Sequence, residues 1–166
     1  MQNLYIDFDG VIMDTINVTY KELKDLEISD NDQIQKYYKD INWEDLLKRT
    51  PQINDSFNCI QKIIDTNIFD VAILTHVNSL KEAVDKIHHI RKYLKHITVI
   101  PVPKIISKTK IVNAENAILV DDYCENLRQW EKAGGVGIRF STKLNGKGFK
   151  VVDRLDQILD IYKISS

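Results

Sequence analysis

Carboxylates and a hydroxyl stand at the ends of apolar segments of the chain, where they could bind a phosphate group and react with it. Asp7 and Asp9 follow the first such stretch, Thr75 ends the second, and Asp121 and Asp122 end the fourth. Four acids brought together would repel one another unless a cation lay among them, and hard oxygen ligands suit Mg²⁺. A hydroxyl and the free amides of a following helix suit a phosphate. Together these groups are the equipment for phosphoryl transfer through an aspartyl-phosphate.

Each feature is a weak signal by itself, and the combination is what favours chemistry. An Asp-x-Asp motif at a strand end is more often a turn or a helix cap, and an Asp-Asp pair is no stronger. Their joint occurrence with a threonine, each at the end of a predicted strand, is hard to attribute to chance. A cation is still needed to balance the charge, and Lys104, Lys108 and Lys110 lie between the third and fourth predicted strands.

Five short segments have the composition of β-strands, and helical patterns fall between them. The segments are Leu4–Asp7, Asp70–Thr75, Ile97–Ile100, Ala117–Asp121 and Val136–Phe140. The second and the fourth are apolar at consecutive positions, as strands buried on both faces require. The alternation predicts an α/β fold in which a five-stranded parallel sheet lies between two helical layers. Such sheets bind ligands at the carboxyl ends of their strands, so the acids and Thr75 are expected at one edge.

The helix after the second strand is predicted to pack through an apolar stripe. Ser79 precedes it, and Glu82 stands at the spacing of a capping box. The stripe repeats at three and four residues, and its members are Leu80, Val84, Ile87, Ile90 and Leu94. The last helix of the chain is predicted from about Val152 to Ile164.

More than sixty residues between the first two predicted strands lack a strand pattern and are predicted to be helical. We expect residues 14–54 to form a small helical insertion, too short to be a domain by itself. Residues 1–13 and 55–166 would then form the core of a single domain that spans residues 1–166. The predicted helices of the insertion are Val18–Leu26, Asp32–Ile41 and Trp43–Arg49.

The composition excludes several classes of protein. The chain has 166 residues, and its 23 Lys and Arg against 24 Asp and Glu leave a formal charge of -1. Such a balance gives no general attraction to a nucleic-acid polymer or to a membrane. The two cysteines, Cys59 and Cys124, lie far apart and suggest neither a disulfide scaffold nor a zinc site. No segment reaches transmembrane length, so the sequence predicts a soluble cytoplasmic protein. It indicates no oligomeric state.

The motifs resemble, in type and in order, those of the haloacid dehalogenase (HAD) superfamily of phosphohydrolases. Asp7-Phe8-Asp9-Gly10-Val11 is similar to the first motif and Leu74-Thr75 to the second. A lysine within Lys104–Lys110 would be the third, and Val120-Asp121-Asp122 is similar to the fourth. The forms DFDGVI and LVDD most resemble the 5'(3')-deoxyribonucleotidases and their bacterial and phage relatives. The resemblance implies a Rossmann-like three-layer sandwich with a helical cap formed by the insertion.

The resemblance also implies roles for the four acids. Asp7 would be the nucleophile that attacks phosphorus. Asp9 would protonate the leaving group and then activate water, since one carboxyl group can serve as acid and then as base. Mg²⁺ would be held by Asp7, by the backbone carbonyl of Asp9 and by Asp122, with Asp121 bound through water. Which of the two adjacent acids touches the metal directly stays open.

The remaining roles concern the phosphate group of the substrate. Thr75 and the amides after it would hold the phosphoryl oxygens. We take Lys108 as the catalytic lysine, because Ser107-Lys108-Thr109 resembles the Asp-Lys-Thr element of the deoxyribonucleotidases. The longer spacing to the acid pair leaves Lys104 and Lys110 open. His76 directly follows Thr75 and is a further candidate for substrate contact.

The sequence thus predicts a Mg²⁺-dependent phosphomonoesterase for a small phosphorylated metabolite, and the resemblance points to deoxynucleoside monophosphates. Aromatic residues of the insertion could stack on a base, although their helical spacing also fits packing of the insertion itself. Another phosphorylated metabolite is an alternative substrate. A receiver domain that stores a phosphoryl group uses similar residues, but it places its acid pair first and its phosphorylated aspartate in mid-chain, unlike this sequence.

Overall fold

A computed structural model describes residues 1–163 and has a six-stranded parallel sheet at its centre, in the order β3-β2-β1-β4-β5-β6. The strands are β1 (Gln2–Ile6), β2 (Phe69–Val77), β3 (Thr98–Pro103), β4 (Ile118–Asp121), β5 (Val136–Phe140) and β6 (Lys150–Val152). β1 lies between β2 and β4. The predicted α/β class is therefore confirmed, and the point where the strand order reverses lies beside β1, where such folds bind their ligands.

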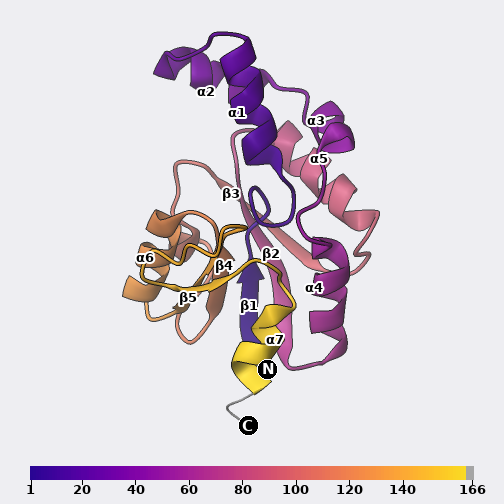
Figure 1. Cartoon of the computed structure of the whole chain (residues 1–166), viewed down its shortest axis with the longest axis vertical. Coiled ribbons are helices and arrows are strands. Elements are labelled where there is room, and N and C mark those ends of the chain that lie inside the picture. The colour runs from indigo at the N-terminus through magenta and orange to yellow at the C-terminus, as the bar shows by residue number, and fades with distance from the viewer. Residues whose placement is uncertain (164–166) are drawn as a thin grey trace.

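Helices cover both faces of the sheet, and Figure 1 shows α6 on one side and α4 and α5 on the other. The helices are α1 (Thr15–Asp25), α2 (Asn31–Asp40), α3 (Trp43–Arg49), α4 (Ser56–Asp65), α5 (Leu80–Arg91), α6 (Cys124–Lys132) and α7 (Gln157–Lys163), with a short 3-10 helix η1 (Lys108–Lys110). Each layer has its own hydrophobic cluster. The cluster under α6 centres on Trp130, which is fully buried and donates its indole N–H to the carbonyl of Ala117. No helix within residues 1–163 is both long and apolar enough to cross a bilayer.

The prediction of five strands was wrong by one, because β6 pairs with β5 at the edge of the sheet. Three residues are too few to show a strand pattern, but their backbone groups gain partners along β5. The segment from Val152 that was predicted as helix is therefore strand and turn at its start, and α7 begins only at Gln157. Its predicted end, at Ile164, lies outside the described residues.

The predicted stripe of the helix α5 was wrong in its first half. Leu80 and Val84 are exposed, whereas Glu82 and Lys86 are buried. Ser79 does cap the helix through the amide of Glu82. The helix is turned in this way because its polar residues find partners beside the sheet, as described below, and only its last turn, with Ile90, packs as the stripe predicts.

The insertion after β1 rises above the carboxyl ends of the strands. Figure 1 shows α1 and α2 standing clear of the sheet at the top of the molecule. α3 differs, because it packs against α5 and contributes Trp43, Leu46 and Leu47 to the main hydrophobic cluster of the sheet. The insertion therefore has a free part, α1 and α2, and a part that is fixed to the core.

Candidate active site

The ends of β1 and β4 bring three carboxylates together. The amide of Asp7 donates to the carbonyl of Val120 over 2.9 Å, so the residues that follow the two strands start side by side. Carboxylate oxygens of Asp7, Asp121 and Asp122 lie within 4.8 Å of one another. Asp7 thus joins Asp121 and Asp122, which lie 114 and 115 positions further along the chain, in one acidic cluster, as the order of the strands requires.

Lys108 is the lysine that reaches this cluster. It lies in η1, is 2% exposed, and donates over 2.8 Å to the Oδ1 atom of Asp7 and over 2.8 Å to the Oδ2 atom of Asp121. Burial alone would lower the pKa of Lys108, but the two carboxylates outweigh it and raise that pKa. Of the other candidates, Lys104 lines the pocket described below, and Lys110 is exposed.

The two adjacent acids differ in their surroundings. The Asp121 side chain is fully buried and accepts hydrogen bonds from Lys108, from the Asn126 amide group and from the Tyr123 backbone amide. These donors occupy both of its oxygens. Asp122 lies nearer to solvent and at the pocket wall, so its carboxylate is the more accessible of the two to a ligand.

The cluster carries more negative charge than Lys108 can balance. Burial, and next the charge of Asp121, raise the pKa of Asp7 to about 7. Burial, and then the charges of Asp7 and Asp121, raise the pKa of Asp122 to about 9. Raised values of this kind mean that burial and the neighbouring carboxylates disfavour the ionised forms, which a bound cation would favour. An all-oxygen site with excess negative charge is of the type that binds Mg²⁺.

Asp9 turns away from the cluster toward the helices. Gly10 follows it with a φ of +75°, and a side chain at this position would collide with the carboxylate of Asp122. The tight turn sends the chain up into α1. There the Thr15 hydroxyl donates to the Oδ1 atom of Asp9 over 2.6 Å, while Lys86 of α5 donates to its Oδ2 atom over 2.6 Å.

Thr75 lies inside β2 rather than at its end, because the strand continues to Val77. Its side chain is fully buried, and its hydroxyl is 3.2 Å from the Lys86 ammonium and 3.3 Å from the carbonyl of His76. The His76 ring lies 2.8 Å from the carbonyl of Ile106 through its Nε2 atom. Burial lowers the pKa of His76, so the ring is neutral at pH 7. His76 reaches the pocket wall with one nitrogen already engaged.

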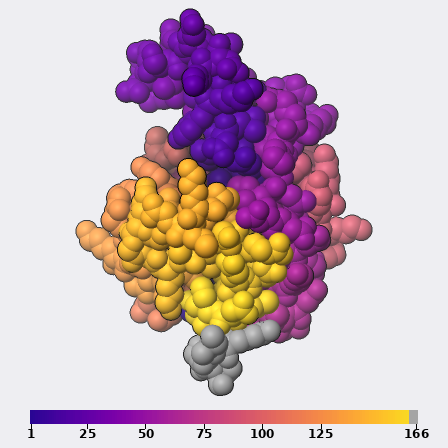
Figure 2. Space-filling view, in the orientation of Figure 1, coloured from indigo at the N-terminus to yellow at the C-terminus, as the bar shows by residue number. Residues whose placement is uncertain are grey.

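A cavity of about 1030 Å³ opens above the acidic cluster, between the core and the insertion. Asp7, Asp9 and Asp122 line its floor, and α1 and α2 line its upper wall. The upper wall is largely apolar and aromatic, with Ile16, Tyr20, Leu23, Ile28, Ile34 and Tyr38. Figure 2 shows the recess between the indigo α1–α2 segment and the orange part of the chain below it.

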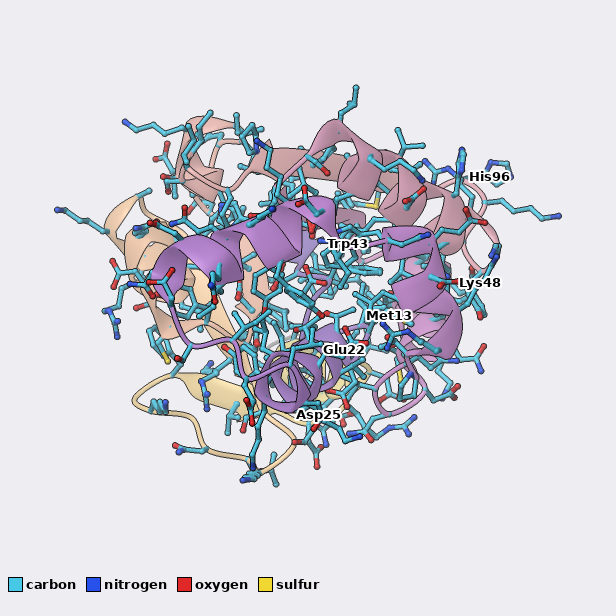
Figure 3. The ribbon with its side chains drawn as sticks, turned by 90° about the horizontal axis from the view of Figure 1, so that it is seen from above. Met13, Glu22, Asp25, Trp43, Lys48 and His96 are labelled. Carbon is cyan, nitrogen blue, oxygen red and sulfur yellow. The ribbon has the colours of Figure 1, made fainter. Side chains whose placement is uncertain are left out.

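Sequence reasoning missed two residues of this site, Glu82 and Lys86, whereas Trp43 is one of the insertion aromatics that it offered for stacking on a base. Glu82 and Lys86 stand four residues apart on the buried face of α5, with their charged groups 3.7 Å apart. Burial raises the pKa of Glu82. That i, i+4 pair of opposite charges directly after a cap was the available signal. Trp43 is 3% exposed and lines the cavity, and Figure 3 shows it pointing inward from the helix that carries Lys48 on its outer side.

No protein-family model matches the sequence, and no curated protein matches it. Solved structures do resemble the fold. A hydrolase from Pseudomonas syringae superposes with a TM-score of 0.66 at 12% identity over 100% of both chains. A HAD phosphatase from Thermococcus onnurineus superposes with a TM-score of 0.63 at 15% identity over 97% of both chains. A D,D-heptose 1,7-bisphosphate phosphatase from B. bronchiseptica, complexed with magnesium and phosphate, superposes with a TM-score of 0.60 at 13% identity over 100% of both chains. The chain therefore has the Rossmann-like α/β fold of HAD-superfamily hydrolases.

Proposed function

We propose that this protein is a Mg²⁺-dependent phosphomonoesterase that works through a phosphorylated Asp7. The observation that carries the proposal is the convergence of Asp7, Asp121, Asp122 and Lys108, because Asp7 and Asp122 of this cluster line a cavity of about 1030 Å³. A buried carboxylate held by a lysine beside further acids has the parts of an activated nucleophile. The likeness to HAD hydrolases and phosphatases in fold agrees with this chemistry.

The donor set fits a magnesium ion. We assign Asp7 and Asp122 as direct ligands, with the backbone carbonyl of Asp9, because Asp121 already accepts hydrogen bonds at both of its oxygens. Asp121 would then hold Lys108 and take part through water. When bound, Mg²⁺ would supply charge stabilisation to the phosphoryl oxygens.

The reaction proceeds in two steps on the residues of this chain. A carboxylate oxygen of Asp7 attacks phosphorus, the bond from phosphorus to the ester oxygen breaks, and the Asp9 carboxyl group gives its proton to the leaving oxygen. Water then attacks the phosphorylated Asp7 and gives a proton to Asp9, and the bond between phosphorus and Asp7 breaks. Lys108 neutralises charge on the phosphoryl oxygens, and Thr75 orients them by hydrogen bonding. Acid–base assistance of this kind contributes roughly 10²- to 10⁴-fold to a rate.

The cavity favours a substrate with a ring-bearing leaving group, and we propose a nucleoside monophosphate, of the deoxy series in the first instance. Tyr20, Tyr38 and Trp43 offer aromatic surfaces to a base. The cavity volume of about 1030 Å³ exceeds what a phosphate group alone needs. Lys104 at the cavity wall adds a positive charge for an anionic substrate.

A panel of phosphomonoesters with Mg²⁺ tests the proposal. We expect the wild-type protein to release phosphate from nucleoside monophosphates faster than from small sugar phosphates. Asp7→Asn should reduce turnover by roughly 10⁴-fold, because the nucleophile is lost. Asp25→Asn, on the exposed end of α1, is the matched control and should leave turnover unchanged. Equal turnover of Asp7→Asn and the wild type would rule out the proposal, and a long-lived acyl phosphate without turnover would favour a receiver domain.

A further inference from the structure

Lys86 is a fully buried cation in contact with Asp9 and Thr75, and the chemistry above leaves it without a role. Its Nζ atom lies 2.6 Å from Asp9 Oδ2, 3.0 Å from the carbonyl oxygen of His76 and 3.2 Å from Thr75 Oγ1. A lysine ammonium has three N–H donors, and these acceptors match all of them. Lys86 therefore has no donor left for a substrate, and what it acts on is the protein itself.

We propose that Lys86 is a positioning residue that holds the Asp9 carboxylate in place to activate water in the second step of the reaction. The inference rests on the proposed function, because it assigns a task within that same site. Lys86 lies in the helix α5, whereas the acids of the cluster and Lys108 come from the strand ends and η1.

The carboxylate of Asp9 is held from two sides. Thr15 of α1 binds one oxygen and Lys86 of α5 binds the other, each over 2.6 Å. Each carboxylate oxygen can accept more than one hydrogen bond, so the pair fixes the orientation of the group and leaves room for a water proton. A base that moves by about 1 Å can lose a hundredfold in rate, so the two contacts bear directly on turnover.

A purely structural role would not call for a lysine at this position. The Nζ atom lies 4.7 Å from the ring centre of Trp43 and 5.4 Å from that of Phe8. An apolar side chain of similar length would fill this aromatic space without the cost of burying a charge. The three acceptors around the ammonium, in contrast, need a cation or another strong hydrogen-bond donor. Two of these acceptors, Asp9 and Thr75, take part in the proposed reaction.

The second step defines what Lys86 must do. Water attacks phosphorus on the phosphorylated Asp7, one water proton passes to Asp9, and the bond from phosphorus to Asp7 breaks to release phosphate. Lys86 keeps its protons throughout and contributes only the position of Asp9. In the first step an aryl ester departs as a stable phenolate and needs no proton, so transfer of its phosphoryl group to Asp7 does not depend on Asp9.

The test is a burst experiment with an aryl phosphate and Mg²⁺ on the full-length protein. In Lys86→Met we expect the initial burst of phenolate to stay within about threefold of the wild type, because no Lys86 contact to substrate is lost. Steady-state turnover should fall roughly tenfold to hundredfold, because phosphorylated Asp7 waits for water. Asp9→Asn should give the same pattern with a larger loss. Lys21→Met, 80% exposed on α1, should match the wild type.

Three results would overturn the inference. These are unchanged turnover of Lys86→Met, a burst slowed as much as turnover, or a crystal structure of Lys86→Met in which the Asp9 carboxylate keeps its place. The structure decides even if the wild type hydrolyses no ester, which would refute the proposed function instead. Should Lys86→Met fail to fold, Lys86→Gln replaces it, since the neutral amide fits the space and supplies only two N–H groups.

Discussion

The two buried lysines of the site sit in contrasting surroundings. Lys108, in η1 between β3 and β4, contacts two carboxylates, those of Asp7 and Asp121. Within the described part of the chain this leaves one of its three N–H groups without an acceptor. Lys86, in α5, has acceptors from the protein for all three. Lys108 therefore has a donor left for a phosphoryl oxygen, and Lys86 has none.

The contrast shows that two lysines of one site can have different tasks: one can bind the phosphate group, and the other positions neighbouring protein groups. A lysine in an acidic cluster that still has an unused N–H group can donate it to a phosphoryl oxygen when the phosphate group is bound. A cation whose donors are all occupied holds its neighbours still, and its loss is felt through them. We therefore expect changes at Lys108 to affect every step that handles the phosphate group, and changes at Lys86 to affect only the steps in which Asp9 takes part, which for an aryl ester is the second step alone.

The largest effect that separates the two lysines is expected for Lys108→Met. Loss of the ammonium removes a donor to the phosphoryl group in both steps, which should lower turnover by roughly 10²- to 10³-fold. Unlike Lys86→Met, this variant should lose the burst as well as the steady state. Rapid-mixing assays with an aryl phosphate measure both phases.

Lys110→Met provides the matched control, because Lys110 lies in the same short 3-10 helix and is exposed. It should match the wild type in both phases. A Lys108→Met variant that kept a normal burst would contradict the division of roles and would make the two lysines equivalent. A thermal melt of each variant shows whether the comparison concerns folded proteins.

A second, smaller effect is the pH dependence of the free energy of unfolding when no Mg²⁺ is bound to the acidic cluster. The pKa of Asp7 in the folded protein is about 7 and that of Asp122 is about 9, both above the ordinary aspartate value of about 4. Between about pH 4 and pH 9 the folded state therefore binds more protons than the unfolded state. The free energy of unfolding contributed by these groups therefore falls as the pH rises from about 4 to 9.

Magnesium should reverse this loss, because it binds the ionised carboxylates and the folded state only. We expect Mg²⁺ to raise the midpoint of urea unfolding more at pH 8 than at pH 6, relative to buffer with EDTA. Asp122→Asn should show a weaker decline with pH and a smaller response to Mg²⁺, and Asp25→Asn should behave as the wild type. An equal response to Mg²⁺ at both pH values would contradict the assignment of the metal site.

The acidic cluster was predictable from the sequence because strand register decides where its members lie. Asp7 follows a strand that pairs with the strand ending in Asp121, so apolar runs and their last residues were enough to bring the acids to one edge. Lys108 was the lysine chosen from three, and it is the one in contact with the cluster. The strand count failed only at β6, whose three residues depend on pairing with β5 rather than on their own pattern.

The face of α5 was not predictable in the same way. The apolar spacing of Leu80 and Val84 favoured one rotation of the helix, and the partners of Lys86 favour another. Those partners lie in two separate segments, at Asp9 and at Thr75, so no local pattern could reveal them. Where a buried polar group has specific acceptors, tertiary contacts determine which face of a helix is buried. The sequence alone indicates this face only through the Glu82–Lys86 spacing.

The smallest expected effect tests whether the aromatic wall next to Lys86 also contacts substrate. The indole N–H of Trp43 is buried and finds no acceptor within the described residues, and a buried donor without a partner costs roughly 1–3 kcal/mol. A substrate oxygen in the cavity would satisfy it. Trp43→Phe keeps an aromatic ring beside Lys86 but removes the N–H, so KM should rise about threefold to tenfold while the aryl phosphate burst stays close to normal.

The same variant separates a substrate contact from a packing role. If the N–H serves the substrate, Trp43→Phe should raise KM and leave turnover at saturating substrate close to that of the wild type. If the ring mainly holds the Lys86 ammonium, to which its centre lies 4.7 Å away, turnover should fall with KM unchanged, as in Lys86→Met. Comparing the change in KM with the change in turnover therefore shows whether Trp43 binds substrate or positions Lys86.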